Sequence, residues 1–142
     1  MNALEAAQCA KIAYLDEGRG AAAAFRLGYS FQFISNNFIS CWIGTKNGKT
    51  VVGFRGSVFF KSSEQNYELN LKTDFVPWIG QGLVHEGYHQ AFWYIFYELM
   101  KIIRSRRDII FTGHSMGGAI ALLAGSIMQV GHVFLFREPA CW

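Results

Sequence analysis

The stretch that decides the fold is residues 108–124, which read DIIFTGHSMGGAIALLA. Asp108 to Thr112 predicts a short buried strand, and Ala119 to Ala124 predicts a buried helix. Between them lies a glycine-rich corner, Gly113-His114-Ser115-Met116-Gly117-Gly118. His132 to Phe136 predicts the next parallel strand. A strand, a helix and a parallel strand within about thirty residues form a βαβ unit. The expected fold class is therefore α/β.

The corner carries the pattern G-x-S-x-G, with Gly113 and Gly117 at the two required positions and Gly118 adding space. Small residues at these positions let the helix pass close to the strand, so that the serine hydroxyl is exposed at the end of the strand. Ser115 would also gain from the positive end of the helix dipole. We therefore predict that Ser115 is a nucleophile, and that the backbone N–H of Met116 stabilises an oxyanion.

Two other interpretations of this corner are weaker. A glycine-rich turn with an incidental serine needs no flanking strand and helix, and both are predicted here. A phosphate-binding loop is disfavoured because no Gly-Lys-Ser/Thr follows the glycines.

A second signal is the segment 51–57, VVGFRGS. It follows a predicted hairpin turn at residues 45–49, where Asn47-Gly48 accepts the positive φ angles that such turns need. The strand runs from Thr50 to Arg55 and stops at a Gly-Ser corner. We predict that the Ser57 backbone N–H is the second oxyanion donor, although an ordinary strand end has the same sequence pattern.

The remaining chain adds elements on both sides of these motifs. Ala3 to Tyr14 predicts a helix, on which Leu4, Ala7, Ile12 and Leu15 can share a face. Residues 31–34 and 38–44 predict strands, and 85–104 a long helix with apolar residues at 3.6-residue spacing. Residues 20–28 are ambiguous, and 58–84 are polar and irregular. The expected sheet has roughly five or six strands.

Composition is that of a single globular domain. The chain has 142 residues, of which 51% are hydrophobic and 16% charged. The net charge is +3, and the densest basic group is Lys101, Arg104, Arg106 and Arg107. We interpret this group as the solvated end of a helix. Nucleic acid is not an expected partner, because the motifs of nucleic-acid binders are missing.

Cofactors and a membrane span are also not expected. Cys9, Cys41 and Cys141 lack the spacing of metal ligands, so no metal is predicted. The start of the chain has no basic and apolar leader, which favours a cytoplasmic protein. Residues 118–136 carry no formal charge. We interpret them as a buried helix, a turn and a buried strand, not as a membrane span.

The two glycine motifs, in this order and spacing, resemble the class 3 lipases, the fungal-lipase-like family of α/β-hydrolases. Three further pieces are similar to the family's pattern: Thr73-Asp74-Phe75, the segment 84–88 (VHEGY), and a divergent strand end at 134–140 with Arg137 where the pattern has glycine. The resemblance spans roughly Cys9 to Pro139.

The resemblance implies a partial α/β-hydrolase fold, a mixed sheet with flanking helices that is truncated at its C-terminal edge, in one incomplete domain (1–142). It implies cleavage of carboxylic esters of lipids, commonly acylglycerols, without a cofactor, and contact with a membrane surface or a lipid droplet. A lid would lie within residues 58–83. The implied site consists of Ser115 as nucleophile, Ser57 and Met116 as the oxyanion hole, and Gly113, His114, Gly117 and Gly118 as the elbow.

One feature departs from the family. In α/β-hydrolases the acid and then the histidine follow the serine. The residues downstream of Ser115 offer only His132, which begins a predicted buried strand, and Glu138, which lies too near the end of that strand. We therefore expect that a longer reading frame or a partner supplies the acid and base.

Two alternatives remain open. The first is a catalytically inactive module, derived from a lipase, that binds lipids or proteins through an exposed strand edge after Val133 to Phe136. The second is a related hydrolase or acyltransferase that acts on small esters, which sequence patterns do not separate from a lipase.

Overall fold

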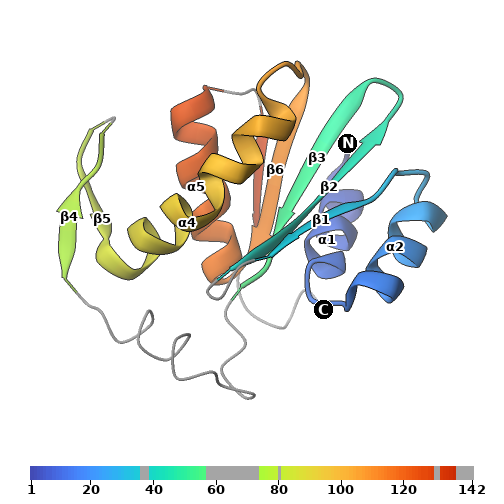
Figure 1. Cartoon of the computed structure of the whole chain (residues 1–142), viewed down its shortest axis with the longest axis horizontal. Coiled ribbons are helices and arrows are strands. Elements are labelled where there is room, and N and C mark those ends of the chain that lie inside the picture. The colour runs from blue at the N-terminus through green and yellow to red at the C-terminus, as the bar shows by residue number, and fades with distance from the viewer. Residues whose placement is uncertain (36–38, 57–73, 80, 130–131, 137–142) are drawn as a thin grey trace.

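The computed structural model describes residues 1–35, 39–56, 74–79, 81–129 and 132–136 (Figure 1). Its main sheet has five strands in the order β1-β2-β3-β6-β7. The first three are antiparallel, whereas β3, β6 and β7 run parallel. The strands are β1 (Gln32–Ser35), β2 (Ser40–Lys46), β3 (Lys49–Phe54), β6 (Ile109–His114) and β7 (His132–Phe136). The predicted α/β class and mixed sheet are confirmed.

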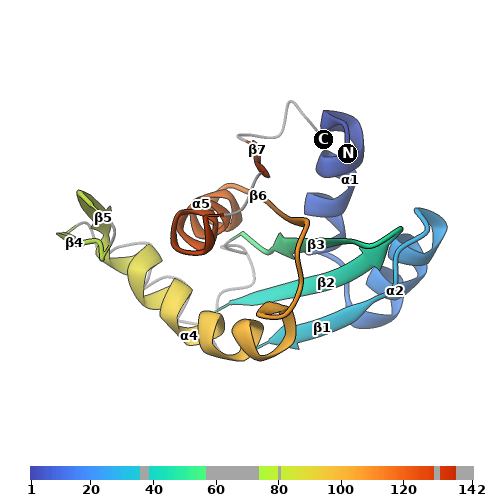
Figure 2. The same cartoon turned by 90° about the horizontal axis from the view of Figure 1, so that it is seen from above.

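Helices cover both faces of the sheet (Figure 2). Helices α1 (Ala3–Ile12) and α2 (Glu17–Arg26) lie on one face, and α4 (Glu86–Ile103) and α5 (Met116–Met128) lie on the other. The side chains of β2 contribute to the hydrophobic core on both faces of the sheet, because successive side chains of a strand point to opposite faces. Cys41 and Ile43 pack toward α4 and α5, whereas Trp42 packs toward α1.

Helix α1 approaches the sheet closely through small side chains. Ala6, Cys9 and Ala10 are fully buried, while Leu4 is 70% exposed. The predicted face with Leu4, Ala7, Ile12 and Leu15 is therefore wrong for Leu4, whereas Ile12 is buried and Ala7 and Leu15 are half-buried. The close approach lets Trp42 Nε1 donate a hydrogen bond to the Cys9 carbonyl oxygen over 2.8 Å.

Two ambiguous segments take regular structure. Residues 20–28 contribute to α2, which begins after Asp16, because the Asp16 carboxylate accepts a hydrogen bond from the Arg19 N–H at 2.9 Å. Within the segment expected to be irregular, β4 (Phe75–Pro77) and β5 (Leu83–His85) form a small hairpin of their own. The expected lid falls largely on residues 57–73, which lie outside the described residues.

The remaining predictions concern the two long apolar stretches. The buried face predicted for the helix at residues 85–104 is confirmed by α4, whose Phe92, Ile95, Leu99 and Ile103 are buried. Residues 118–136 contain the rest of α5 and the strand β7, so the predicted helix and strand are confirmed. The prediction that the strand is buried is wrong, because every residue of β7 is half-buried or exposed at the edge of the sheet. Within the described residues no helix has the length and apolar character to cross a membrane. Among the described residues, strand β7 forms one edge of the sheet.

Candidate active site

Ser115 stands at the junction between β6, which ends at His114, and α5, which begins at Met116. Its backbone has φ 57° and ψ −126°. This is the mirror image of an extended conformation and is normally reserved for glycine. The residue is exposed, and its side chain makes no capping hydrogen bond to α5. The corner thus holds a hydroxyl outward in a strained backbone.

Main-chain hydrogen bonds hold this strained conformation. The Ser115 N–H donates to the carbonyl oxygen of Phe136 over 3.1 Å, which extends the pairing of β6 with β7. The Ser115 carbonyl oxygen accepts from the N–H groups of Gly118 at 2.9 Å and Ala119 at 3.3 Å, which starts α5. Strain of this kind persists only where the surroundings over-determine the geometry.

The glycines of the elbow are required by close backbone packing. A Cβ atom on Gly113 would overlap the backbone of Gly117. A Cβ on Gly117 would overlap the carbonyl oxygen of Phe54 and lie 2.9 Å from the Gly56 nitrogen. The start of α5 therefore lies directly against the end of β3, with no room for side chains between them.

Of the two predicted oxyanion donors, only Met116 lies among the described residues. The Met116 N–H is in the first turn of α5, where N–H groups have no partner within the helix and carry the positive end of its dipole. Ser57 lies outside the described residues, but its neighbour Gly56 contacts the elbow. The parallel pairing of Phe54 with Gly113 brings the end of β3 level with Ser115.

Tyr14, at the end of α1, was missed by the sequence analysis. Its hydroxyl donates to the His114 carbonyl oxygen at 3.2 Å and lies 3.0 Å from Nδ1 of the same residue. The hydroxyl has one proton, so the tautomer of His114 decides which atom donates in the second bond. Burial raises the pKa of Tyr14, while a hydrogen bond from the Gly56 backbone and the charge of Arg55 oppose the shift. Tyr14 therefore ties together α1, β6 and the end of β3.

The other histidines lie in structural positions. His85 caps α4, with Nδ1 accepting from the Gly87 N–H at 3.1 Å, and His89 Nε2 accepts from Trp93 Nε1 at 3.1 Å. His132 pairs with Ile110, at the opposite end of the parallel strands from Ser115. Glu138 lies outside the described residues. His132 is thus not brought to the elbow.

Among the described residues, no three side chains of His, Cys, Asp or Glu gather as a metal site requires.

The chain has a partial α/β-hydrolase fold. Its parallel βαβ unit, with a strained, exposed serine between strand and helix, has the arrangement that is typical of a nucleophile elbow. The sequence pattern of Lipase (class 3) matches residues 51–140, which is more than half of the chain. The chain belongs to the class 3 lipase family. No curated protein sequence matches it.

Solved structures share this fold. A triacylglyceride lipase from Rhizomucor miehei is 20% identical, with a TM-score of 0.67 over 94% of this chain and 59% of its own. The propeptide complex of a Rhizomucor miehei lipase is 20% identical, with a TM-score of 0.62 over 94% and 50% of the two chains. A mutant form of MDLA from Penicillium cyclopium is 17% identical, with a TM-score of 0.57 over 89% and 55%. The chain thus spans less than two thirds of the length of these structures.

Proposed function

We propose that this chain is the nucleophile-bearing part of an ester hydrolase that cleaves carboxylic esters of lipids, such as acylglycerols, through an acyl-enzyme on Ser115. The observation that carries the proposal is the geometry of Ser115, an exposed serine held at φ 57° at the start of a helix. Nothing in the packing of the fold requires a serine here, because glycine would adopt this backbone without strain. A strained residue in an exposed corner is typical of a functional site.

The chemistry follows from the donors around the corner. Ser115 Oγ attacks the carbonyl carbon of the ester while a base takes its proton. The negative charge that develops on the carbonyl oxygen is stabilised by the Met116 N–H and, in this proposal, by the Ser57 N–H. The alcohol leaves with the proton, and water then releases the acid from Ser115.

The acid and the base come, in this proposal, from outside the described residues, either from further polypeptide or from a partner. The position of His132 supports this part, because it lies at the far end of β7 from the elbow. Removing triad members from a serine hydrolase leaves only the acceleration due to the oxyanion hole and binding, roughly 10³–10⁴ over water. We expect the chain alone to have activity of that scale.

A lipid substrate fits the exposed apolar side chains on the flank formed by the β4–β5 hairpin and α4. Phe75, Ile79 and Leu83, on the β4–β5 hairpin and the turn within it, are all exposed, and so are Trp93 and Tyr97 on α4. Exposed aromatic and aliphatic side chains of this kind favour contact with a lipid–water interface. We propose that this flank contacts a membrane surface or a lipid droplet during catalysis.

The second candidate is an inactive module derived from a lipase that binds lipids or another protein. The edge strand β7 favours it, because the exposed Leu135 and the unpaired side of the strand could take another strand. This candidate predicts association of the chain without hydrolysis.

Hydrolysis of p-nitrophenyl esters separates the two candidates. With imidazole added as an external base, we expect the chain to release p-nitrophenol faster than Ser115→Ala, and Ser105→Ala, an exposed serine beyond α4, to match the parent. Equal release by the parent chain and Ser115→Ala, together with a dimer or a complex in size-exclusion chromatography, would favour the binding module.

A further inference from the structure

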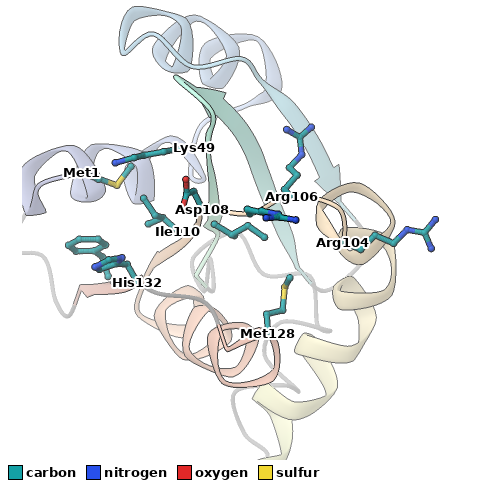
Figure 3. A pocket seen from close by; sticks show the side chains of 11 residues that line it. Met1, Lys49, Arg104, Arg106, Asp108, Ile110, Met128 and His132 are labelled. Atoms are coloured by element: carbon teal, nitrogen blue, oxygen red, sulfur yellow. The ribbon is translucent and has the colours of Figure 1, made fainter.

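A cavity of about 580 Å³ opens at the end of the sheet opposite Ser115 (Figure 3). Its lining comes from Met1, from Lys49 at the start of β3, from the connection between α4 and β6 with the first residues of β6, and from Met128, His132 and Phe134 on α5 and β7. The Thr50 N–H donates to the Asp108 carbonyl oxygen over 3.0 Å, which joins the start of β3 to the connection between α4 and β6. The cavity is therefore built by the sheet itself at the starts of its parallel strands.

The lining is strongly cationic. Lys49, Arg104, Arg106 and Arg107 contribute four positive charges, and Asp108 contributes the single carboxylate. Figure 3 shows Lys49 and Arg106 on opposite sides of Asp108, with Arg104 further out at the rim. The side chains therefore leave a formal excess of three positive charges around one cavity.

These cations are not neutralised within the described part of the chain. Lys101, which belongs to the same basic cluster in the sequence, pairs with Glu98 at 3.1 Å. No ion pair joins Lys49, Arg104, Arg106 or Arg107 to a carboxylate among the described residues. The solvated end of a helix explains the position of Arg104. It does not explain why Lys49, which comes from a hairpin distant in sequence, lines the same cavity.

One wall of the cavity is apolar. Ile110 is buried, and Met128 and Phe134 are half-buried beside it. His132 adds a polar group on the same strand as Phe134. A cavity with clustered cations and an adjacent apolar wall suits a ligand with an anionic head and an apolar body.

We propose that this cavity binds a phosphate monoester, with the phosphate held by Lys49, Arg106 and Arg107 and any acyl part against Ile110 and Phe134. A dianionic phosphate matches the excess of positive charge better than a carboxylate does, and the arginine fork suits its oxygens. The ester is either a lipid, such as a phosphatidate, or a small water-soluble phosphate. This site is separate from Ser115 and does not depend on hydrolysis.

Isothermal titration calorimetry tests the proposal with two probes, dihexanoyl phosphatidate below its critical micelle concentration and glycerol 3-phosphate. We expect saturable binding of one ligand per chain that weakens as ionic strength rises. The double variant Arg106→Gln/Arg107→Gln is expected to bind about tenfold more weakly, since each exposed charged contact adds only modestly to the affinity. Asp108→Asn is expected to bind more tightly, because it removes the carboxylate that repels the phosphate.

Arg19→Gln/Arg26→Gln, which removes two cations from α2, is the matched control and is expected to bind like the parent chain. Tighter binding of phosphatidate assigns the site to a lipid, and equal binding of both probes assigns it to a free phosphate ester. The proposal is overturned if neither probe binds saturably, or if the two double variants lose affinity equally. Ser115→Ala is expected to bind both probes unchanged.

Discussion

The Tyr14 hydroxyl lies 3.0 Å from Nδ1 of His114, which joins the end of α1 to the end of β6 across 100 residues of sequence. The same hydroxyl donates to the His114 carbonyl oxygen at 3.2 Å. Because His114 directly precedes Ser115, this contact fixes the backbone that leads into the proposed nucleophile. Tyr14 is therefore a positioning residue for the elbow.

Tyr14→Phe should destabilise the fold and loosen the elbow. The change leaves the buried partners of the hydroxyl unsatisfied, which costs about 1–3 kcal/mol of unfolding free energy. Tyr29→Phe, which removes a hydroxyl bonded to Glu5 at 2.8 Å, is the matched control far from the elbow. Denaturant unfolding and the rate of Ser115 acylation would be measured for both. An acylation rate that falls equally in both variants would contradict the positioning role.

Ser115→Gly should be more stable than Ser115→Ala. Both variants lose the hydroxyl, but only glycine adopts φ 57° and ψ −126° without strain. Strained backbone positions cost about 1–3 kcal/mol, so the midpoint of thermal unfolding should be higher for Ser115→Gly. In an ordinary helix start the order would be reversed, since glycine increases the entropy of the unfolded chain. An alanine variant as stable as the glycine variant would show that the corner is not strained.

Gly117→Ala should strongly destabilise the fold. Its Cβ would overlap the Phe54 carbonyl oxygen, and backbone atoms on both sides cannot move aside without breaking the β3–β6 pairing. Overpacking of this kind costs about 1–3 kcal/mol or more. Gly18→Ala in α2 is the control, because its nearest neighbour would be 3.6 Å away. Circular dichroism during heating should show a much lower midpoint of unfolding for Gly117→Ala and a slightly higher midpoint for Gly18→Ala.

The contribution of Glu5 to stability should fade in acid. The Tyr29 hydroxyl, and then Lys46 at 3.1 Å, lower the pKa of the Glu5 carboxyl from its ordinary 4.5. A lowered pKa stabilises the fold above pH 4.5, and this stabilisation is lost as the pH falls through the folded-state pKa. The difference in unfolding free energy between the parent chain and Glu5→Gln should therefore be constant near neutral pH and shrink in acid.

Glu98→Gln, which removes a carboxylate from an exposed pair on α4, is the control for that titration. A difference between parent and Glu5→Gln that grows on acidification would contradict the assigned direction of the shift.

The elbow could be predicted because its signals are local. Glycine spacing around Ser115 and the apolar segments on either side lie within one short stretch, so the strand, corner and helix follow from sequence alone. The hairpin at Asn47-Gly48 is local in the same way, and both residues have the positive φ angles expected.

Contacts between distant segments could not be predicted in this way. Tyr14 ends a helix, and nothing near it in the sequence indicates His114 as a partner. The face of α1 was predicted wrongly because hydrophobicity favours Leu4, whereas the close approach of the helix to the sheet requires the small side chains of Ala6 and Ala10. Lys49 likewise joins the basic cluster only through strand pairing.

Labelling with a fluorophosphonate tests the central claim most directly, because the reagent reports whether the strained corner presents a reactive hydroxyl. Peptide mass spectrometry of the folded chain, labelled with imidazole present as an external base, should find the adduct on Ser115, with none on the exposed Ser105, and the adduct should vanish in Ser115→Ala. An adduct shared equally by Ser115 and Ser105, or no adduct on folded protein, would contradict the assignment of Ser115 as the nucleophile.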